Sequence, residues 1–382
     1  MKKIAIIHDW LTGMRGGEMV LEALCEIFPS ADIFTLVHIH GSVSEIIESK
    51  KIKTSFLQKI PFAKKRYRSF LPFFPLAIEN FDITDYDLVL SSSHCVAKGV
   101  IPHPSAVHVC YCHTPMRYVW NHYYTYFGNK KGLIAKFLMP AVANYLRMWD
   151  IASNNRVDNF VANSYNVASR IEKYYKRSAD VIHPPVDCSL YTPSERFKEG
   201  DYYLIVSAFA PYKRIDIAVE AFEKLGAPLI IIGGGQEEGR IKSLSRKYAQ
   251  CVGWKPGESL REYYRNCKAL IFPGEEDFGI VPLEAQACGK PVIAFAKGGV
   301  LETVRGIYSP YDTTEGNFAQ RPESPTGVFF ARQTIESLTE AVKYFEQNKN
   351  LFDPTLIRKH AESFDRPIFK EKFKQYIEKL LC

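Results

Sequence analysis

The sequence lacks the long apolar run that a membrane-spanning helix requires. Its apolar stretches all stop short of about 18 uninterrupted residues, and the first of them, residues 4–7, turns polar at His8 and Asp9. We therefore expect neither a transmembrane helix nor a signal peptide there. Pairs of the CxxC type are also absent, and the nine cysteines are scattered and odd in number. This cysteine usage fits a reducing compartment better than a disulfide framework, and it predicts a cytoplasmic protein.

The sequence also lacks the features of a nucleic-acid-binding protein. It has no long basic tract, no zinc-ligand spacing and no aromatic signature of an RNA-binding module. Its formal charge is nevertheless +7 and its pI about 8.8, so the surface should attract anions such as nucleotide diphosphates or anionic lipids. With 382 residues, the chain is long enough for two domains of about 150 residues each.

Short apolar runs alternate with segments of helical periodicity along the chain. The runs predict buried strands at 4–7, 88–90, 107–110, 159–162, 203–206, 229–232, 269–272 and 292–295. The periodic segments predict helices at 17–28, 166–175, 215–225 and 239–248. Alternation of this kind predicts an α/β protein whose parallel sheets carry helices on both faces.

A polar, proline-rich passage at 184–200 interrupts the alternation, which restarts near residue 200. The composition is typical of an interdomain linker, so we predict two doubly wound, Rossmann-like domains at 1–190 and 195–364. The tail, residues 365–382, is amphipathic and begins with an Asp and a Pro, as helices often do. We expect it to form a helix that completes the first domain.

Residues 275–289 follow a predicted strand directly and contain the strongest candidate for an anion site. Pro282 is suited to the first turn of a helix, which predicts a helix start there. The residues before and at that start would offer free backbone N–H groups to a diphosphate, at Phe278, Gly279, Ile280 and Val281.

Two carboxylates flank this predicted anion site. Glu276 belongs to the loop at the carboxyl end of the strand, where open parallel sheets bind ligands, and Glu284 lies within the helix. Their placement suits them to accept hydrogen bonds from sugar or ribose hydroxyls. The alternative is that both glutamates only oppose the dipole of the helix.

A second candidate segment is 207–216, between a predicted strand and an amphipathic helix. Lys213 and Arg214 would neutralise the charge that develops on a leaving nucleoside diphosphate. A merely solvated basic pair is the other interpretation, and it is less favourable because cations at a helix start oppose the dipole.

A third segment, 109–120, again follows a strand and contains His113. The near-neutral pKa of imidazole suits a histidine to catalysis or to a structural role. We favour the catalytic role for His113, whereas His108 and Cys112 lie in or next to the strand and are predicted to be structural. In the first loop, Gly16 and Gly17 would let backbone amides approach a ligand closely, or would only permit a tight turn.

The triplet Asp85-Tyr86-Asp87 is of the D-x-D type that binds a divalent metal and a diphosphate in some transferases. It precedes a predicted strand instead of ending one. A surface turn explains it more simply, and we expect no metal and no cofactor.

Residues 59–75 combine five cations with aromatic residues and prolines. Cations beside exposed aromatics are what a peripheral contact with an anionic membrane needs. A solvated loop over a small hydrophobic cluster is the equally weighted alternative.

These strings together resemble the retaining GT-B glycosyltransferases of family GT4, from Gly16 to the carboxyl-terminal helix. Glu276 and Glu284 match the family's E-x7-E motif, 211–216 its P-Y-K-R-I-D segment and 111–118 its Y-x-H-T-P-x-R-Y string. The first loop resembles its G-G-x-E element. The chain departs from the pattern at Ala208, where many relatives carry an arginine.

The resemblance implies a role for each matching residue at a site between the two domains. Glu276 would lie against the donor sugar, Glu284 against the ribose, Lys213 against the donor phosphates and His113 near the sugar. Further donor contacts would come from the segments that contain Ser164, Gly233, Gly234 and Trp254. On the acceptor side the matching residues are Arg117, Tyr118 and Arg170.

Within the family, the strings look most like bacterial mannosyltransferases that use GDP-mannose in O-antigen or exopolysaccharide synthesis. The resemblance thus implies transfer of a hexose to a glycan acceptor, carried on a lipid and reached from the inner face of the membrane. Alternatives are a UDP-sugar-dependent transferase, a nucleotide-sugar epimerase of the same build, and a non-catalytic sugar-binding protein. A dinucleotide-dependent dehydrogenase would need a glycine fingerprint that residues 9–35 do not supply.

Overall fold

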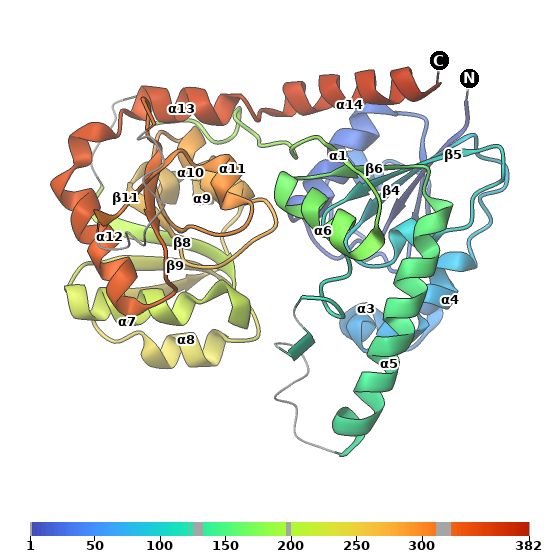
Figure 1. Ribbon diagram of the computed structural model, residues 1–382, viewed down its shortest axis with the longest axis horizontal. Helices are drawn as coiled ribbons and strands as arrows, with labels where there is room; N and C mark the ends of the chain where they lie inside the picture. Colours follow the sequence, from blue (N-terminus) through green and yellow to red (C-terminus); the bar gives the residue numbers. More distant parts are fainter. Residues whose placement is uncertain (1, 122, 125–132, 196–199, 311–321, 382) are drawn as a thin grey trace. The chain divides into compact units, whose positions relative to one another are not determined.

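The computed structural model describes residues 2–121, 123–124, 133–195, 200–310 and 322–381. The chain forms two compact units, each built on a seven-stranded sheet (Figure 1). Unit 1 comprises residues 1–185 and 369–382, and unit 2 comprises residues 186–368. The predicted α/β class, with two doubly wound domains, is confirmed. Part of the predicted linker, 196–199, lies outside the described residues.

All strands of the unit 1 sheet are parallel, in the order β3-β2-β1-β4-β5-β6-β7. The strands are β1 (Ile4–His8), β2 (Asp32–Thr35), β3 (Ile52–Thr54), β4 (Leu88–Ser93), β5 (Val107–Cys112), β6 (Asn159–Ala162) and β7 (Asp180–Val181). Their almost continuous apolar sequences reflect burial on both faces. The order reverses between β1 and β4, which makes the carboxyl ends of these two strands the topological switch point.

Helices cover both faces of the unit 1 sheet. They are α1 (Gly16–Ile27), α2 (Glu45–Glu48), α3 (Ala63–Arg66), α4 (Phe74–Glu79), α5 (Leu133–Ala152), α6 (Tyr165–Tyr175) and α14 (Arg366–Leu381). α1 and α14 pack in one hydrophobic cluster, and α4 and α5 pack in another on the opposite face. Among the described helices, none is long and apolar enough to cross a membrane.

Unit 2 repeats the plan, with the strand order β10-β9-β8-β11-β12-β14-β13 and a switch point between β8 and β11. Its strands are β8 (Tyr202–Ala208), β9 (Leu229–Gly234), β10 (Ala249–Gly253), β11 (Cys267–Phe272), β12 (Val292–Phe295), β13 (Gly306–Tyr308) and β14 (Gly327–Phe330). Its helices are α7 (Ile215–Leu225), α8 (Glu238–Leu244), α9 (Gly257–Arg265), α10 (Ile280–Ala287), α11 (Val300–Thr303), α12 (Ile335–Gln347) and α13 (Pro354–Glu362).

Two helix boundaries differ from the prediction by more than one residue. The helix expected at 239–248 ends at Leu244, because the Glu223 carboxylate accepts hydrogen bonds from the backbone N–H groups of residues 246–249. The helix expected to start at Pro282 starts at Ile280 instead. Gly279, with φ of +104°, occupies the position before it in the left-handed conformation that favours glycine.

Candidate functional site

The switch point of unit 2 brings Lys213 and Glu276 into contact. Lys213 ends a short 3₁₀ turn (Pro211–Lys213) that follows β8, and Glu276 lies in the loop after β11. The Lys213 ammonium donates a hydrogen bond to the Glu276 carboxylate and forms an ion pair with it. Their side chains are 11% and 25% exposed, so both remain accessible to a ligand. The sequence identified both residues, and the fold places them at one point.

Glycines allow the loops around this pair to approach closely. A Cβ atom on Gly274 would lie 2.8 Å from the Lys213 Cα atom. The Gly299 N–H donates a 2.8 Å hydrogen bond to the Glu276 carbonyl, and a Cβ on Gly299 would lie 2.3 Å from the Asp277 carbonyl oxygen. The backbone of the Glu276 loop is thus held by the loop after β12. The sequence analysis did not single out these two glycines, although each follows a predicted strand.

The amino end of α10 lies directly after the Glu276 loop. Ile280 and Val281 occupy its first turn, where backbone N–H groups have no partner within a helix. Such an end suits an anion. Phe278 differs from its neighbours, because its side chain is buried and its ring centroid lies 6.0 Å from that of Phe364. It can serve a ligand only through its backbone.

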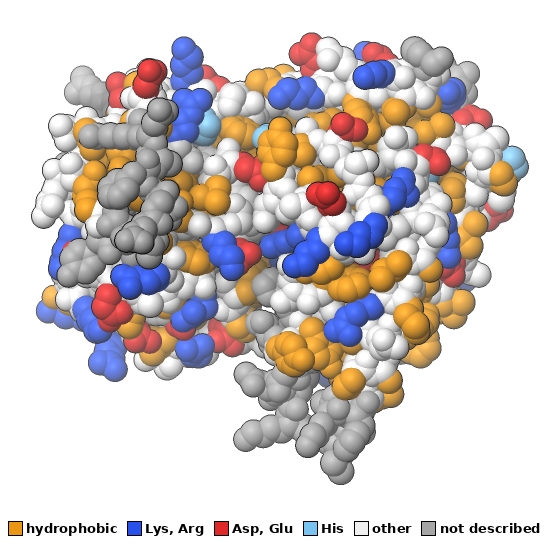
Figure 2. All heavy atoms as spheres, viewed as in Figure 1, with side chains coloured by type: hydrophobic (Ala, Val, Ile, Leu, Met, Phe, Trp, Pro, Cys, Tyr) orange, Lys and Arg blue, Asp and Glu red, His pale blue; other side chains and the backbone are white. Residues whose placement is uncertain are grey.

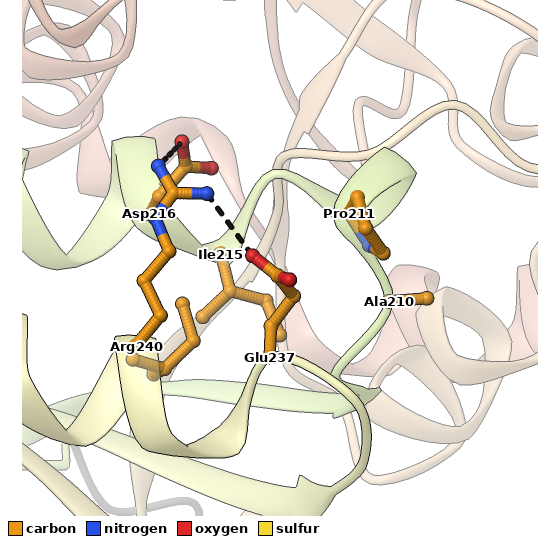
Figure 3. A pocket seen from close by; sticks show the side chains of 7 residues that line it. Ala210, Pro211, Ile215, Asp216, Glu237 and Arg240 are labelled. Carbon is orange, nitrogen blue, oxygen red and sulfur yellow. Dashed lines mark hydrogen bonds and ion pairs between the residues drawn. The ribbon is translucent and has the colours of Figure 1, made fainter. Parts of the chain in front are cut away.

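Arg214, the second predicted cation, forms an ion pair within its own segment. Its Nε donates a 3.1 Å hydrogen bond to Asp216, and Arg240 bridges Asp216 and Glu237 at 3.2 and 3.0 Å. Figure 3 shows the two ion pairs of Arg240 beside a small hollow that Ile215 helps to line. The carboxylates already neutralise these arginines, so Lys213 is the better-placed cation for a diphosphate.

Glu284 lies on the inner side of α10 and is 7% exposed. Tyr264, from α9, donates a 2.7 Å hydrogen bond to its carboxylate. Burial raises the pKa of Glu284 to about 7, although hydrogen bonds from Tyr264 and Tyr191 oppose the increase. Its predicted contact with a ribose stays a prediction.

The switch point of unit 1 carries a chain of buried polar side chains. His8 ends β1, and its Nδ1 lies 3.1 Å from the Ser92 hydroxyl of β4. The same hydroxyl lies 2.8 Å from Nε2 of His113, directly after β5. A Cβ on Gly17 would lie 3.6 Å from His8 and 3.8 Å from His113, so glycine leaves room beside both rings. Burial, with His94 and His8 nearby, holds the pKa of His113 well below its usual value.

Asp9 anchors the adjacent loop. Its carboxylate accepts hydrogen bonds of 2.6 to 3.0 Å from four successive backbone N–H groups, those of residues 94–97. It also pairs with His94 at 3.0 Å. Burial alone would raise the pKa of Asp9, but the contacts with His94 outweigh it and lower the pKa.

Glu18 is a further buried carboxylate at this switch point, 3.7 Å from His8. Burial would raise its pKa, but the nearby imidazoles of His8 and His94 outweigh that effect and lower it. Sequence reasoning missed His8, Asp9, Ser92 and His94 as site residues. The available signal was that all four lie at the carboxyl ends of predicted parallel strands.

Family comparisons match both halves of the chain to glycosyltransferases. Residues 192–361 match the model of glycosyl transferases group 1, and residues 14–190 match the model of glycosyltransferase family 4. The two matches leave few residues uncovered and divide the chain near the boundary between the units. The chain belongs to the group 1 glycosyltransferases.

Curated relatives of this glycosyltransferase have low sequence identity to it, and the alignments cover only part of each relative. The chain is 24% identical over 335 residues to alpha-1,3/1,6-mannosyltransferase ALG2 of Saccharomyces cerevisiae, covering 72% of this chain and 62% of ALG2. It is 30% identical over 159 residues to an uncharacterised glycosyltransferase of Methanocaldococcus jannaschii, covering 40% and 44%. It is 28% identical over 189 residues to the D-inositol 3-phosphate glycosyltransferase of Mycobacteroides abscessus, covering 42% and 43%. The chain thus spans less than two thirds of the length of each of these relatives, from 43% to 62%.

Solved structures share the whole fold of the glycosyltransferase. Anabaena HepE, solved in complex with UDP and glucose, has a TM-score of 0.69 at 14% identity over 99% of this chain and all of that one. Sucrose-phosphate synthase of Thermosynechococcus elongatus has a TM-score of 0.71 at 18% identity, over 100% and 99%. At such identities the likeness establishes the GT-B fold.

The other residues predicted to contact the donor from unit 2 lie at further strand ends. Gly233 and Gly234 end β9, where a Cβ on Gly233 would lie 1.9 Å from the Ser207 carbonyl oxygen, so a glycine is required there. Trp254 follows β10 and is 75% exposed, which leaves a large aromatic face open to a ligand.

Some of the other site residues predicted in unit 1 have a structural role of their own. Ser164 caps α6 by accepting a hydrogen bond from Val167, and its hydroxyl donates to Asn163, whose amide in turn donates to the His113 carbonyl. Gly16 is the first residue of α1. Arg117 and Tyr118 are half-buried after β5, and Arg170 is half-buried in α6.

The D-x-D triplet lies in a turn before β4. The Asp87 carboxylate accepts a 2.7 Å hydrogen bond from the Lys3 backbone, and Asp85 lies 3.5 Å from the Lys3 ammonium. Both contacts fit the predicted surface turn. His108 is fully buried and lies 2.9 Å from the Ser91 hydroxyl, and Cys112 is buried, as a structural role requires.

Proposed function

We propose that the protein is a retaining hexosyltransferase that moves mannose from GDP-mannose to a glycan acceptor in cell-surface polysaccharide synthesis. The observation that carries the proposal is the contact of Lys213 with Glu276 beside the amino end of α10. These groups supply a cation, a carboxylate and backbone N–H groups at one switch point, which are the partners of a sugar diphosphate.

The proposed chemistry needs no metal ion and no cofactor. The charge of the departing nucleoside diphosphate is balanced by the Lys213 ammonium and by the N–H groups of Ile280 and Val281. The bond from the sugar to the diphosphate breaks, the acceptor hydroxyl attacks from the face that the diphosphate leaves, and its proton passes to the departing diphosphate, so the configuration is retained. Trapping of a glycosyl adduct on a carboxylate of the enzyme would refute this path.

The donor is inferred from similarity. Of the three curated relatives described above, ALG2 aligns over the largest part of this chain, and it is named as a mannosyltransferase, which favours mannose. HepE was solved with UDP and with UDP-glucose, which favours the second candidate, a UDP-sugar-dependent transferase of the same fold. A nucleotide-sugar epimerase would share the diphosphate site, but it would form product without an acceptor.

The test is equilibrium binding of a nucleotide-sugar panel, with and without chelator, to the intact chain and two variants. We expect GDP-mannose to bind best, with no effect of the chelator. Lys213→Ala should weaken binding about 10- to 100-fold, because a hydrogen bond to a charged group contributes about 1.5–3 kcal/mol. Glu276→Ala should mainly reduce transfer to an added acceptor.

Lys297→Ala is the matched control, since Lys297 is an exposed lysine that pairs with Glu275 at 3.1 Å in the same unit. It should bind donor like the wild type. Absence of binding to every nucleotide sugar would overturn the transferase proposal, whereas preference for a UDP-sugar would overturn only the donor.

We also propose that residues 59–75 contact an anionic membrane, which would bring the enzyme to a lipid-linked acceptor. Phe62 and Phe73 are 79% and 54% exposed, and the exposed cations Lys64 and Arg66 lie between them in the chain. Figure 2 shows basic side chains beside apolar ones over the part of unit 1 where Figure 1 draws α4 and α5. Vesicle binding, described in the Discussion, tests this contact.

A further inference from the structure

Three potential metal ligands converge in the segment that follows β2. Nε2 of His38 lies 3.1 Å from one oxygen of Glu48, and Nδ1 of His40 lies 3.0 Å from the other. The candidate ligand atoms of the three residues lie within 4.8 Å of one another. Both histidines lie in the loop between β2 and α2, and Glu48 is the last residue of α2.

Backbone contacts position two of these ligands. The His38 N–H donates a 3.0 Å hydrogen bond to the side-chain oxygen of Gln58, whose amide donates to the His38 carbonyl at 2.9 Å. Glu48 accepts a 2.8 Å hydrogen bond from the Gly41 N–H. The side chains of His38 and Glu48 are 13% and 15% exposed, whereas that of His40 is 91% exposed. The cluster is therefore largely buried at His38 and Glu48 and open to solvent at His40.

The ligand set matches the preference of zinc. Zn²⁺ binds imidazole nitrogen and carboxylate oxygen at about 2.0–2.2 Å, so neighbouring ligands of a tetrahedral site lie roughly 3.3 Å apart. The observed separations of 3.0 and 3.1 Å are close to that value. Mg²⁺ and Ca²⁺ prefer six or more oxygen ligands, which this cluster does not offer.

We propose that His38, His40 and Glu48 form a binding site for a zinc-type divalent cation, with a water molecule as the fourth ligand. This site is separate from the proposed transfer chemistry, which uses Lys213 and Glu276.

The position of the site indicates a stabilising role. The loop that holds His38 is paired with the first loop of unit 1: the Leu11 N–H donates to the Val37 carbonyl at 2.8 Å, and the Ile39 N–H donates to the Leu11 carbonyl at 2.9 Å. Leu11 lies between Asp9, at the switch point, and the glycine pair. A bound ion would therefore hold the loop beside the candidate ligand site of unit 1.

The competing account is that two imidazoles simply hydrogen-bond one carboxylate and bind no ion. The experiment that separates the accounts is a Zn²⁺ titration of the full chain without an affinity tag, stripped with chelator, dialysed, and measured against a chromophoric competitor. We expect one zinc ion per chain. His40→Ala and Glu48→Gln should each weaken the affinity at least 10-fold, because each removes one of three protein ligands.

His103→Ala is the matched control, since His103 is also an exposed loop histidine of unit 1 and contacts only Ser105 among the hydrogen bonds recorded for it. It should bind zinc like the wild type. Replacing Zn²⁺ by Co²⁺ should give the intense visible absorption of a tetrahedral site. Because His40 is exposed, His40→Ala should keep the circular dichroism and unfolding temperature of the metal-free wild type. Failure of the wild type to bind zinc, or equal zinc affinity in the wild type and His40→Ala, would overturn the proposal.

Discussion

The environment of Glu284 couples the stability of the protein to pH. Its pKa is about 7 in the folded chain, compared with about 4.5 for an ordinary glutamate. Between pH 4.5 and pH 7, the Glu284 carboxyl group has lost its proton in the unfolded chain but keeps it in the folded chain. The contribution of this residue to stability is therefore complete below pH 4.5 and falls as the pH rises to 7.

Glu284→Gln removes the ionisation but retains the size of the side chain and an oxygen that can accept from Tyr264. The stability of the variant relative to the wild type should therefore rise between pH 4.5 and 7, by about 3 kcal/mol at most. Urea unfolding of both proteins at several pH values measures the difference. A difference that does not change with pH would show that Glu284 titrates normally.

Individual residues were predictable where a motif marked them, and much less so where their role depends on a distant partner. Lys213, Glu276 and His113 stand in strings of characteristic spacing. The sequence did not show that Arg214 pairs with Asp216, because the direction in which a side chain turns is not visible in the order of residues. Asp9 was missed for a related reason: the N–H groups that it binds are more than 80 residues along the chain.

At the scale of elements, glycines decide how closely the loops after β8, β11 and β12 approach one another. Gly299→Ala would place a methyl group 2.3 Å from backbone atoms of Asp277 and Phe278, which cannot move as a flexible side chain would. We expect the variant to lose about 2 kcal/mol or more of stability and to bind donor weakly, since the loop of Glu276 shifts.

Gly239→Ala is the control for this prediction. Gly239 lies in α8, where a Cβ atom would meet no other atom within 4 Å. Alanine should stabilise that helix by up to about 1 kcal/mol and leave donor binding unchanged. Midpoints of denaturant unfolding and donor titrations measure both variants. Equal stability of the two variants would mean that the backbone around Gly299 can move away from the added methyl group without loss of stability.

Element boundaries were less predictable than the elements themselves. Apolar periodicity identified four adjacent strands in each sheet, because burial on both faces of a parallel sheet leaves a clear pattern, but it missed the remaining strands and several helices, among them α5, α9, α12 and α13. The early end of α8 depends on Glu223 in α7, and the early start of α10 depends on the left-handed conformation of Gly279. Neither effect is visible in local periodicity.

At the scale of the whole molecule, the proposed function requires the chain to bind both a nucleotide sugar and an acceptor at a membrane. We predict that the intact protein sediments with vesicles that contain anionic phospholipid and not with neutral vesicles. Each cation near an anionic surface contributes about 1 kcal/mol, so Lys64→Ala with Arg66→Ala should weaken binding roughly 30-fold.

The matched control for the membrane prediction is Lys242→Ala with Lys343→Ala, which removes two exposed cations from unit 2. Its vesicle binding should equal that of the wild type. Equal loss in both double variants would show that the attraction comes from net charge alone, and the assignment to residues 59–75 would then be wrong.

The sequence alone determined the α/β class, the existence of two domains, four strands of each sheet and the resemblance to the family, because these follow from local periodicity and from short motifs. Only the tertiary structure decided which strand ends are neighbours. The sheet orders place β1 beside β4 and β8 beside β11, so they bring Ser92 to His8 and Glu276 to Lys213. The physical reason is that hydrogen bonding between distant strands, which no local pattern encodes, sets the contacts at the carboxyl edge of each sheet.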